Sequence, residues 1–480
     1  MSLSDLSTLL PEMMLVLWAS ALLLLDATAL KARRGWTAFL AVLGLAVALG
    51  LALAQGGGLG AAFGGMVVSD GFATFLEALL AVSGILGVVL AYDYLERQGL
   101  ARGEYYVLLL FSVAGMMLMA KAADLLVMFL ALELFSIPLY VLSGFARPKV
   151  ESEEAALKYF LLGALAAAFL VYGIALTYGA TGTTLISGVA EAVQKGAANL
   201  TLLAFGGGLI LVGLGFKIAA VPFHMWTPDV YQGAPSPVTG FMAVGAKVGG
   251  FAALLRVLVL AFPALSAQLT PILWALAALT MFLGNVVALV QKNIKRMLAY
   301  SSIAHAGYML LAVVAYGDAA LSQTAVAAVL FYLLAYTVTN FGAWAVVVAL
   351  ERSEGKGLDI ADYAGLGRRR PWMALAMTVF MLSFAGMPPT VGFIGKFYLF
   401  RVAVEAGYIG LAVIGVLTSV ISVYYYMRVV TTMYMKEGTP ETSTEGWLNL
   451  GMALTAIATV VLGVAFAPAF HWAVQAVLHL

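Results

Sequence analysis

The sequence contains no cysteine and few charged residues. Of its 480 residues, 63% are hydrophobic and only 10% are charged, whereas a soluble domain averages about 25% charged. Without cysteine the chain can form no disulfide and no cysteine-ligated zinc or iron–sulfur site. The net charge of +1 offers no basis for binding nucleic acid through bulk electrostatics. Composition therefore excludes a disulfide scaffold, a cysteine-bound metal centre and a nucleic-acid-binding protein.

Long apolar segments follow one another along the whole chain. About 20 helical residues cross the roughly 30 Å of bilayer hydrocarbon, and the apolar runs are continuous and not alternating, which favours helices over a β-barrel. The first segment lacks a basic start and a cleavage site, so we predict a membrane helix there and not a signal peptide. We predict an all-α polytopic membrane protein, a single membrane domain over 1–480, with helices near 9–26, 36–54, 72–91, 105–120, 124–145, 154–178, 201–233, 237–261, 271–290, 296–316, 320–350, 372–404, 408–435 and 446–469.

Lysine and arginine fall mostly on one side of these predicted helices. If the N-terminus lies outside, the inside loops carry most of the 25 Lys and Arg residues, and only the loop after the seventh helix has none. Cytoplasmic loops of membrane proteins are enriched in these residues. We therefore predict that both termini lie outside and that the longest polar connection, 352–371, lies along the inner surface. The basic residues assigned to the outside are Lys121, Lys195, Arg256 and Arg401.

Four lysines fall inside the predicted apolar helices: Lys158, Lys217, Lys247 and Lys396. A lysine at a helix centre costs about 2.5–3.5 kcal/mol on insertion, so such residues normally face the bundle interior and mark ion paths. The alternative is a side chain that reaches the membrane surface, for which Lys217 lies too deep. A structural role is equally open for Lys158, which can pair with Glu154 one turn away.

Glycine and proline interrupt two of the predicted helices beside a lysine. Gly215 and Pro222 flank Lys217 in the seventh helix, and Pro388 and Pro389 precede Lys396 in the twelfth. Proline cannot donate the helical hydrogen bond, so the helix breaks and frees backbone groups. The two breaks are five helices apart, and an odd spacing places them in opposite directions. We therefore predict two inverted five-helix repeats, helices four to eight over about 105–261 and helices nine to thirteen over about 271–435.

One acidic residue, Glu133, lies in the middle of a predicted helix. A lone buried carboxylate favours its protonated form, and a nearby lysine restores its charge. Lys217 has matching depth, so we predict that the two residues pair. A pair that opens and closes changes how firmly the lysine holds its proton. The sequence shows no carboxylate cluster suited to Na⁺, which favours protons as the transported ion.

Polar residues share one face on each of three predicted helices. Any single one is more typical of a hydrogen bond between packed helices. Together they predict a hydrated axis between Lys247 and Lys396, with His305 as its connector. The three faces are Ser301, Ser302, His305 and Tyr308; Tyr332, Tyr336 and Asn340; and Ser419, Ser422 and Tyr426.

Several long motifs resemble one known family. The segments LALELFSIPLYVLSGF, GFKIAAVPFHMWTPDVYQGAPSPVTGFM, KRMLAYSSIAHAGYML and GMPPTVGFIGKFYLF are similar to the subunit N family of bacterial NADH–quinone oxidoreductase, respiratory complex I. The related subunit M typically has Glu where Lys396 stands, and subunit L carries a long C-terminal lateral helix. The resemblance implies an antiporter-like fold with broken helices seven and twelve. The functional residues that it implies are Glu133, Lys158, Lys217, Lys247 and Lys396.

The resemblance also implies an activity, partners and a location. It implies a proton-translocating subunit of NADH–quinone oxidoreductase, in which NADH, FMN, iron–sulfur clusters and quinone are bound by other subunits and no cofactor by this chain. The partners would be other membrane subunits of complex I, the lipid bilayer and protons. The location would be a bacterial inner (plasma) membrane, with both termini periplasmic.

Two alternatives stay open at this point. One is a subunit of an Mrp-type Na⁺/H⁺ antiporter, which shares the broken-helix core. The other is a passive scaffold that is needed only for assembly. Co-purification with a redox enzyme distinguishes the main interpretation from the first alternative, and lysine substitutions that leave coupling intact would favour the second.

The predicted orientation can be tested directly because the chain has no native cysteine. Single cysteines at positions 34 and 369 should react with an impermeant maleimide only from the cytoplasmic side, and a cysteine at position 195 only from outside. The asymmetry of basic residues is the reason for this expectation. Labelling of position 369 from outside would reverse the orientation.

Overall fold

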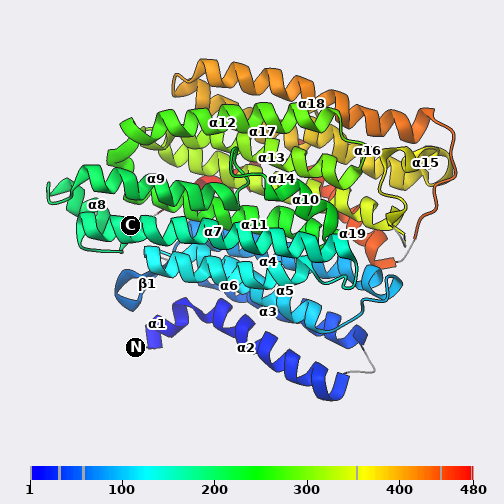
Figure 1. The fold of residues 1–480 in the computed structure, drawn as a ribbon, viewed down its shortest axis with the longest axis horizontal. Coiled ribbons are helices and arrows are strands. Elements are labelled where there is room, and N and C mark those ends of the chain that lie inside the picture. The colour runs from blue at the N-terminus through cyan, green and yellow to red at the C-terminus, as the bar shows by residue number, and fades with distance from the viewer. Residues whose placement is uncertain are drawn as a thin grey trace.

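The computed structural model describes residues 3–30, 34–56, 60–352, 355–443, 446–476 and 478, and nearly all of them are helical (Figure 1). The elements of the first half are α1 (Leu3–Thr8), α2 (Leu10–Leu25), α3 (Arg34–Gln55), β1 (Gly60–Ala62), β2 (Val67–Ser69), α4 (Gly71–Arg97), α5 (Glu104–Lys121), α6 (Leu125–Ser143), α7 (Val150–Thr181), α8 (Ile186–Gln194), α9 (Leu200–Lys217) and α10 (Trp226–Gly233). Those of the second half are α11 (Ser236–Arg256), α12 (Ser266–Leu289), α13 (Ile294–Val313), α14 (Ser322–Leu350), α15 (Leu366–Arg369), α16 (Pro371–Ala385), α17 (Val391–Glu405), α18 (Ile409–Met435), α19 (Gly446–Val464) and α20 (Ala467–Gln475).

The predicted membrane helices are confirmed. Within the described residues, thirteen helices are long and apolar enough to cross a membrane. The twelfth predicted helix, 372–404, is divided into α16 and α17, each too short to be counted with the others. The predicted breaks are present in the seventh and twelfth helices, where α9 ends at Lys217 and α16 ends at Ala385. The boundaries of the two repeats remain a prediction.

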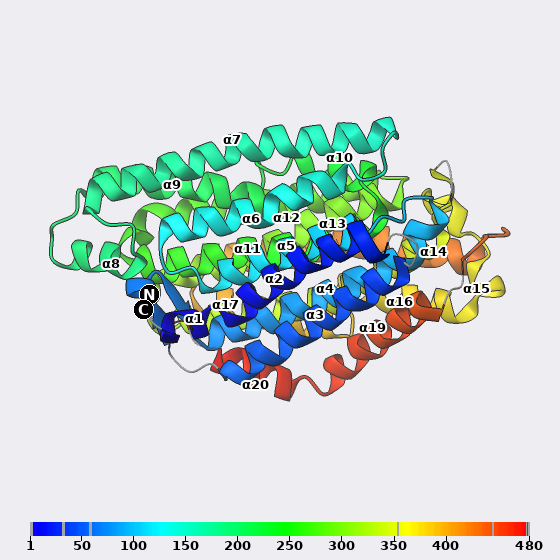
Figure 2. The same ribbon diagram turned by 90° about the horizontal axis from the view of Figure 1, so that it is seen from below.

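Three helices form the centre of the bundle. Every residue of α11 is buried, and α13 and α14 are buried over almost their whole length. Peripheral helices such as α7, α18 and α19 surround them (Figures 1 and 2) and leave large apolar side chains exposed, among them Leu165, Val420 and Ile457. An apolar exposed face with a packed centre is what a lipid-facing bundle requires, because lipid penalises polar groups and not apolar ones.

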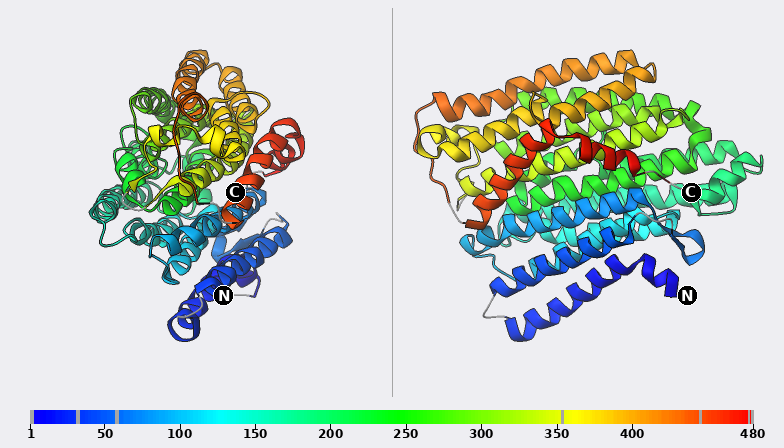
Figure 3. Two further views of the ribbon diagram at one scale, coloured as in Figure 1. Left: turned by 90° about the vertical axis from the view of Figure 1, so that its right-hand side faces the viewer. Right: turned by 180° about the vertical axis from the view of Figure 1, so that it is seen from behind.

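The two ends of the bundle differ in character. Both chain termini lie at one end, together with α1, the β1–β2 hairpin and α8 (Figures 1 and 3); we call this the hairpin end. The opposite end, which carries residues 98–103 and α15, is called the basic end. The side chain of position 34, near the basic end, lies outside the described residues.

Two small elements were not predicted. The β1–β2 hairpin is antiparallel, with Gly60 opposite Ser69 and Ala62 opposite Val67, and its turn contains Gly64 and Gly65 with positive φ. The adjacent glycines Gly64 and Gly65 between two predicted helices were the available signal for that turn. The other element is α8, which packs Ile186, Val189 and Ala190 inward at the hairpin end.

Close helix packing depends on glycine where α7 meets α9. A Cβ added at Gly206 would lie 2.7 Å from Oγ1 of Thr177 and 2.9 Å from the carbonyl oxygen of Gly173. The latter is backbone of the facing helix and cannot move without separating the two helices. Small residues allow this close approach in membrane bundles.

We therefore expect Gly206→Ala to destabilise the protein by about 1–3 kcal/mol, the usual cost of overpacking. Gly208→Ala is the matched control on the same helix, because nothing lies within 4 Å of its added Cβ. The measurement is the thermal stability and yield of the protein extracted from membranes. Equal behaviour of the two variants would show that α7 and α9 are not held at this distance.

Candidate functional site

Lys217 lies directly before the break in the seventh helix and is held by an aromatic cage. Its Nζ donates a hydrogen bond to Oγ of Ser136 at 2.7 Å. The rings of Phe135, Tyr140 and Tyr159 stand around the ammonium at 4.9, 5.8 and 5.3 Å from their centroids. Aromatic faces attract cations. The cage and one hydroxyl therefore stabilise the ammonium, and no described residue supplies a direct counter-ion.

Lys247 donates to backbone that the same break exposes. Its Nζ lies 3.3 Å from the carbonyl oxygen of Ile218 and 3.0 Å from that of Ser302. In an unbroken helix the Ile218 carbonyl would accept from the residue four positions later, which is Pro222 and has no N–H. The proline thus leaves an acceptor free, and Lys247 supplies the missing donor.

Lys396 repeats this arrangement at the second break. Its Nζ donates to the carbonyl oxygen of Ala385 at 3.2 Å and to Oγ of Ser419 at 2.8 Å. The residue four positions after Ala385 is Pro389, so this carbonyl also lacks its helical donor. A Cβ at Gly386 would lie 2.8 Å from Cδ of Lys396, which explains why glycine stands where the lysine stem crosses the break.

His305 joins the polar faces of three helices, as the sequence predicted. Its Nδ1 lies 2.6 Å from the hydroxyl of Tyr332 on α14, and its Nε2 lies 3.1 Å from that of Tyr426 on α18. Tyr426 also contacts Ser301 at 2.5 Å. The ammonium of Lys396 is 4.6 Å from the ring centroid of Tyr308, whose ring packs against His305. On the other side, Ser302 accepts a hydrogen bond from Tyr336 at 2.9 Å.

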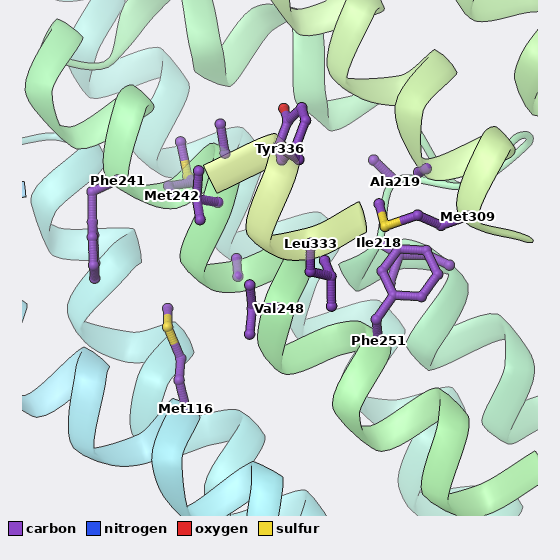
Figure 4. Close-up of a cluster of buried hydrophobic side chains, with 14 of the residues drawn as sticks. Met116, Ile218, Ala219, Phe241, Met242, Val248, Phe251, Met309, Leu333 and Tyr336 are labelled. Atoms are coloured by element: carbon purple, nitrogen blue, oxygen red, sulfur yellow. The ribbon is translucent and has the colours of Figure 1, made fainter. Parts of the chain in front are cut away.

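Apolar side chains enclose this polar axis. Figure 4 shows Phe251 of α11, Met309 of α13 and Leu333 of α14 beside Ile218 at the break, whereas Met116 of α5 lies farther away, on the side of Phe241. All of them are buried. The lysines are therefore separated from bulk water by packed hydrocarbon, which strengthens each electrostatic contact inside.

The predicted direct pair between Glu133 and Lys217 is not formed. Among the described ion pairs within 4.0 Å, none joins these residues, and Lys217 bonds to Ser136 instead. Glu133 lies one turn before Ser136 on α6, is only partly buried, and has no hydrogen-bond partner for its Oε1 among the described residues. The exposed apolar residues Leu130 and Ile137 flank it. The correction has a physical reason, because Ser136 and Tyr140 on the same helix take the contacts with Lys217, while Glu133 lies at the edge of that face.

Lys158 lies at the basic end in a charged cavity of about 690 Å³ and is partly exposed. The predicted bond to Glu154 is present at 2.6 Å, and a second carboxylate, Asp229 of α10, lies at 2.7 Å. Asp229 also accepts from Arg296 at 2.7 Å. Lys158 therefore belongs to a surface-connected charge network and not to the enclosed axis with Lys217, Lys247 and Lys396.

Several buried charges were missed. Lys121 and Arg256 were assigned to the outer surface, yet both side chains are fully buried at the hairpin end. Arg256 pairs with Asp70 at 2.8 Å, and Lys121 pairs with Glu77 at 2.7 Å. Lys295, assigned to an inside loop, is buried as well. Glu77 at matching depth in the adjacent helix was the available signal for the Lys121 pair, but a lysine at a helix end is usually solvated.

The comparisons with known proteins agree with this geometry. The family described as NADH:quinone oxidoreductase/Mrp antiporter, TM, matches residues 122–422. The NADH-quinone oxidoreductase subunit N of Trichlorobacter lovleyi is 49% identical, with 98% of this chain and 97% of that protein covered. A chain of respiratory complex I from Thermus thermophilus with bound aureothin has a TM-score of 0.83 at 38% identity, covering 96% of this chain and 98% of that one. An Mrp complex chain from Dietzia, 21% identical with a TM-score of 0.86 and coverage of 99% and 97%, shares the fold.

Broken helices with a lysine at each break, together with the family match, place the chain among the antiporter-like membrane subunits. The relatives that match over nearly its whole length narrow this class. The chain belongs to the NADH-quinone oxidoreductase subunit N family.

Proposed function

We propose that this chain translocates protons along an axis through Lys217, Lys247, His305 and Lys396, as a membrane subunit of NADH-quinone oxidoreductase. The observation that carries the proposal is the pairing of each of two lysines with a carbonyl freed by proline. A backbone carbonyl stabilises a charged lysine but brings no fixed negative charge, so the ammonium remains able to release its proton. His305 lies between Lys247 and Lys396 and can bind a proton at either ring nitrogen.

The charged cavity around Lys158 and Asp229 is the proposed entry for protons. It opens at the basic end, which the distribution of Lys and Arg assigns to the cytoplasm. In this orientation both termini face the periplasm of a bacterial inner membrane. Lys158 then acts at the mouth of the path, where two carboxylates keep it charged.

The redox chemistry is assigned to partner subunits. NADH, FMN, iron–sulfur clusters and quinone are proposed to bind there, because this chain has no cysteine and belongs to a family of membrane subunits. The proposed partners are the other membrane subunits of complex I, with lipid around the exposed apolar helices. An Mrp-type antiporter subunit is the second candidate, favoured only by the shared fold, while the close relatives carry the subunit N name.

The first test removes the central lysine. Lys247→Ala should leave an assembled complex with impaired proton translocation and slower quinone reduction, because the two processes are coupled. Proton uptake into vesicles and NADH-driven quinone reduction are measured on the same preparation. The control is Lys195→Ala, since Lys195 is an exposed lysine on the hairpin end. Normal translocation in assembled Lys247→Ala complexes would remove this residue from the path.

The second test concerns the charge at Glu133. Among the described residues Glu133 and Lys217 form no direct ion pair, although their charges interact. We propose that they approach each other during turnover, which alternates Lys217 between holding and releasing its proton. Glu133→Asp keeps the charge on a shorter arm and should retain part of the activity. Glu133→Gln keeps the shape without the charge and should behave like Glu133→Ala. If the Gln variant translocates protons as well as the Asp variant, the charge is irrelevant.

A further inference from the structure

A group of buried charges at the hairpin end takes no part in the axis described above. Lys121 of α5, Glu77 of α4 and Glu12 of α2 meet there, and their side chains are 0%, 0% and 6% exposed. Nζ of Lys121 lies 2.7 Å from Oε1 of Glu77 and 3.1 Å from Oε1 of Glu12. Two carboxyl groups thus share one ammonium inside the protein.

The hydrogen-bond donors of Lys121 are fewer than its acceptors. Besides the two carboxyl groups, its Nζ lies 2.8 Å from the carbonyl oxygen of Thr8 and 3.1 Å from Oε1 of Gln55. An ammonium has three N–H donors, but four groups compete for them. Within the described residues, Oε2 of Glu77 has no hydrogen-bond donor. A proton on one carboxyl group would supply the fourth donor.

The charge balance also indicates that one of the two carboxyl groups carries a proton. Two ionised carboxylates and one ammonium leave one buried negative charge, which is costly without a partner. The neighbouring cation, Arg256 of α11, does not compensate for it, because Arg256 is paired with Asp70 at 2.8 Å. Its Nε donates to the carbonyl oxygen of Ala120 at 2.7 Å. Within the described ion pairs, Arg256 and Asp70 neutralise each other.

We propose that Glu12 and Glu77 hold one proton between them over Lys121 and that this carboxyl pair releases protons at the hairpin end. The two carboxyl groups contact the same Nζ of Lys121, Glu77 at 2.7 Å and Glu12 at 3.1 Å. Glu77 is the deeper member, and Glu12 reaches the surface with a small part of its side chain. A proton moves from the Glu77 carboxyl to the Glu12 carboxylate and leaves from there to water outside. The next proton restores the singly protonated pair, which is neutral together with the Lys121 ammonium. The release role rests on the proposed function, whereas the shared proton does not.

The test uses Glu77→Gln in the whole complex. The amide N–H of Gln supplies the fourth donor, so assembly should be normal. The infrared difference spectrum between wild type and variant should show the loss of one carboxylic-acid carbonyl band that shifts in D₂O. Proton translocation per quinone reduced should fall severalfold, and Glu12→Gln should give the same two results. The matched control is Glu191→Gln on α8, an exposed glutamate at the same end, which should change neither readout.

The possible results separate the parts of the proposal. An unchanged carbonyl band in both variants would show that the pair holds no proton and would overturn the proposal. A lost band with normal translocation would overturn the release role. Failure of both variants to assemble would show that the ionised carboxylates serve structure alone, and would also overturn it. If Lys247→Ala translocates normally while the band is lost in Glu77→Gln, the proton site stands and the proposed axis fails.

Discussion

The structure depends on one interaction that occurs twice: a lysine ammonium donates to a backbone carbonyl that a proline has left without its helical donor. At the first break Lys247 reaches the carbonyl of Ile218, and at the second Lys396 reaches that of Ala385. Neither partner is tolerable alone, because an unpaired carbonyl and an unpaired ammonium are both costly away from water. Each makes the other possible, so the breaks and the lysines have to occur together.

The rest of the bundle supports these two contacts. Gly250 and Gly386 provide the room, since a Cβ at Gly250 would lie 2.7 Å from Cγ2 of Ile218. The central helices α11, α13 and α14 carry Lys247 and the polar residues around His305, and the peripheral helices keep lipid away from them. Lys217 differs from the other two lysines, because rings and a serine hydroxyl hold it in place of a carbonyl. A carboxylate that approaches Lys217 would therefore change the stabilisation of its ammonium more than an approaching carboxylate would at Lys247 or Lys396.

Local features made much of this arrangement predictable. Continuous apolar runs located the helices, and Pro222 and Pro389 located the breaks, because the loss of an N–H acts within one turn. The spacing of polar residues placed His305 on the same face as Ser301 and Ser302. The missing contact between Glu133 and Lys217 was not predictable, since Ser136, one turn further along α6, accepts the hydrogen bond of Lys217 instead. Lys121 is buried because residues from four other segments, distant in the sequence, contact it. A local sequence pattern does not predict such long-range contacts.

The central place of α13 has a consequence for how the chain enters the membrane. This helix carries serines, tyrosines and a histidine, and in the finished protein almost none of its surface faces outward. A newly made helix of this kind gains little by contact with lipid, because its polar groups would lack partners there. It has to be sheltered by α12 and α14 as it leaves the insertion machinery, so these three helices are expected to enter the bilayer as one unit. We therefore expect the insertion of α12, α13 and α14 to be cooperative.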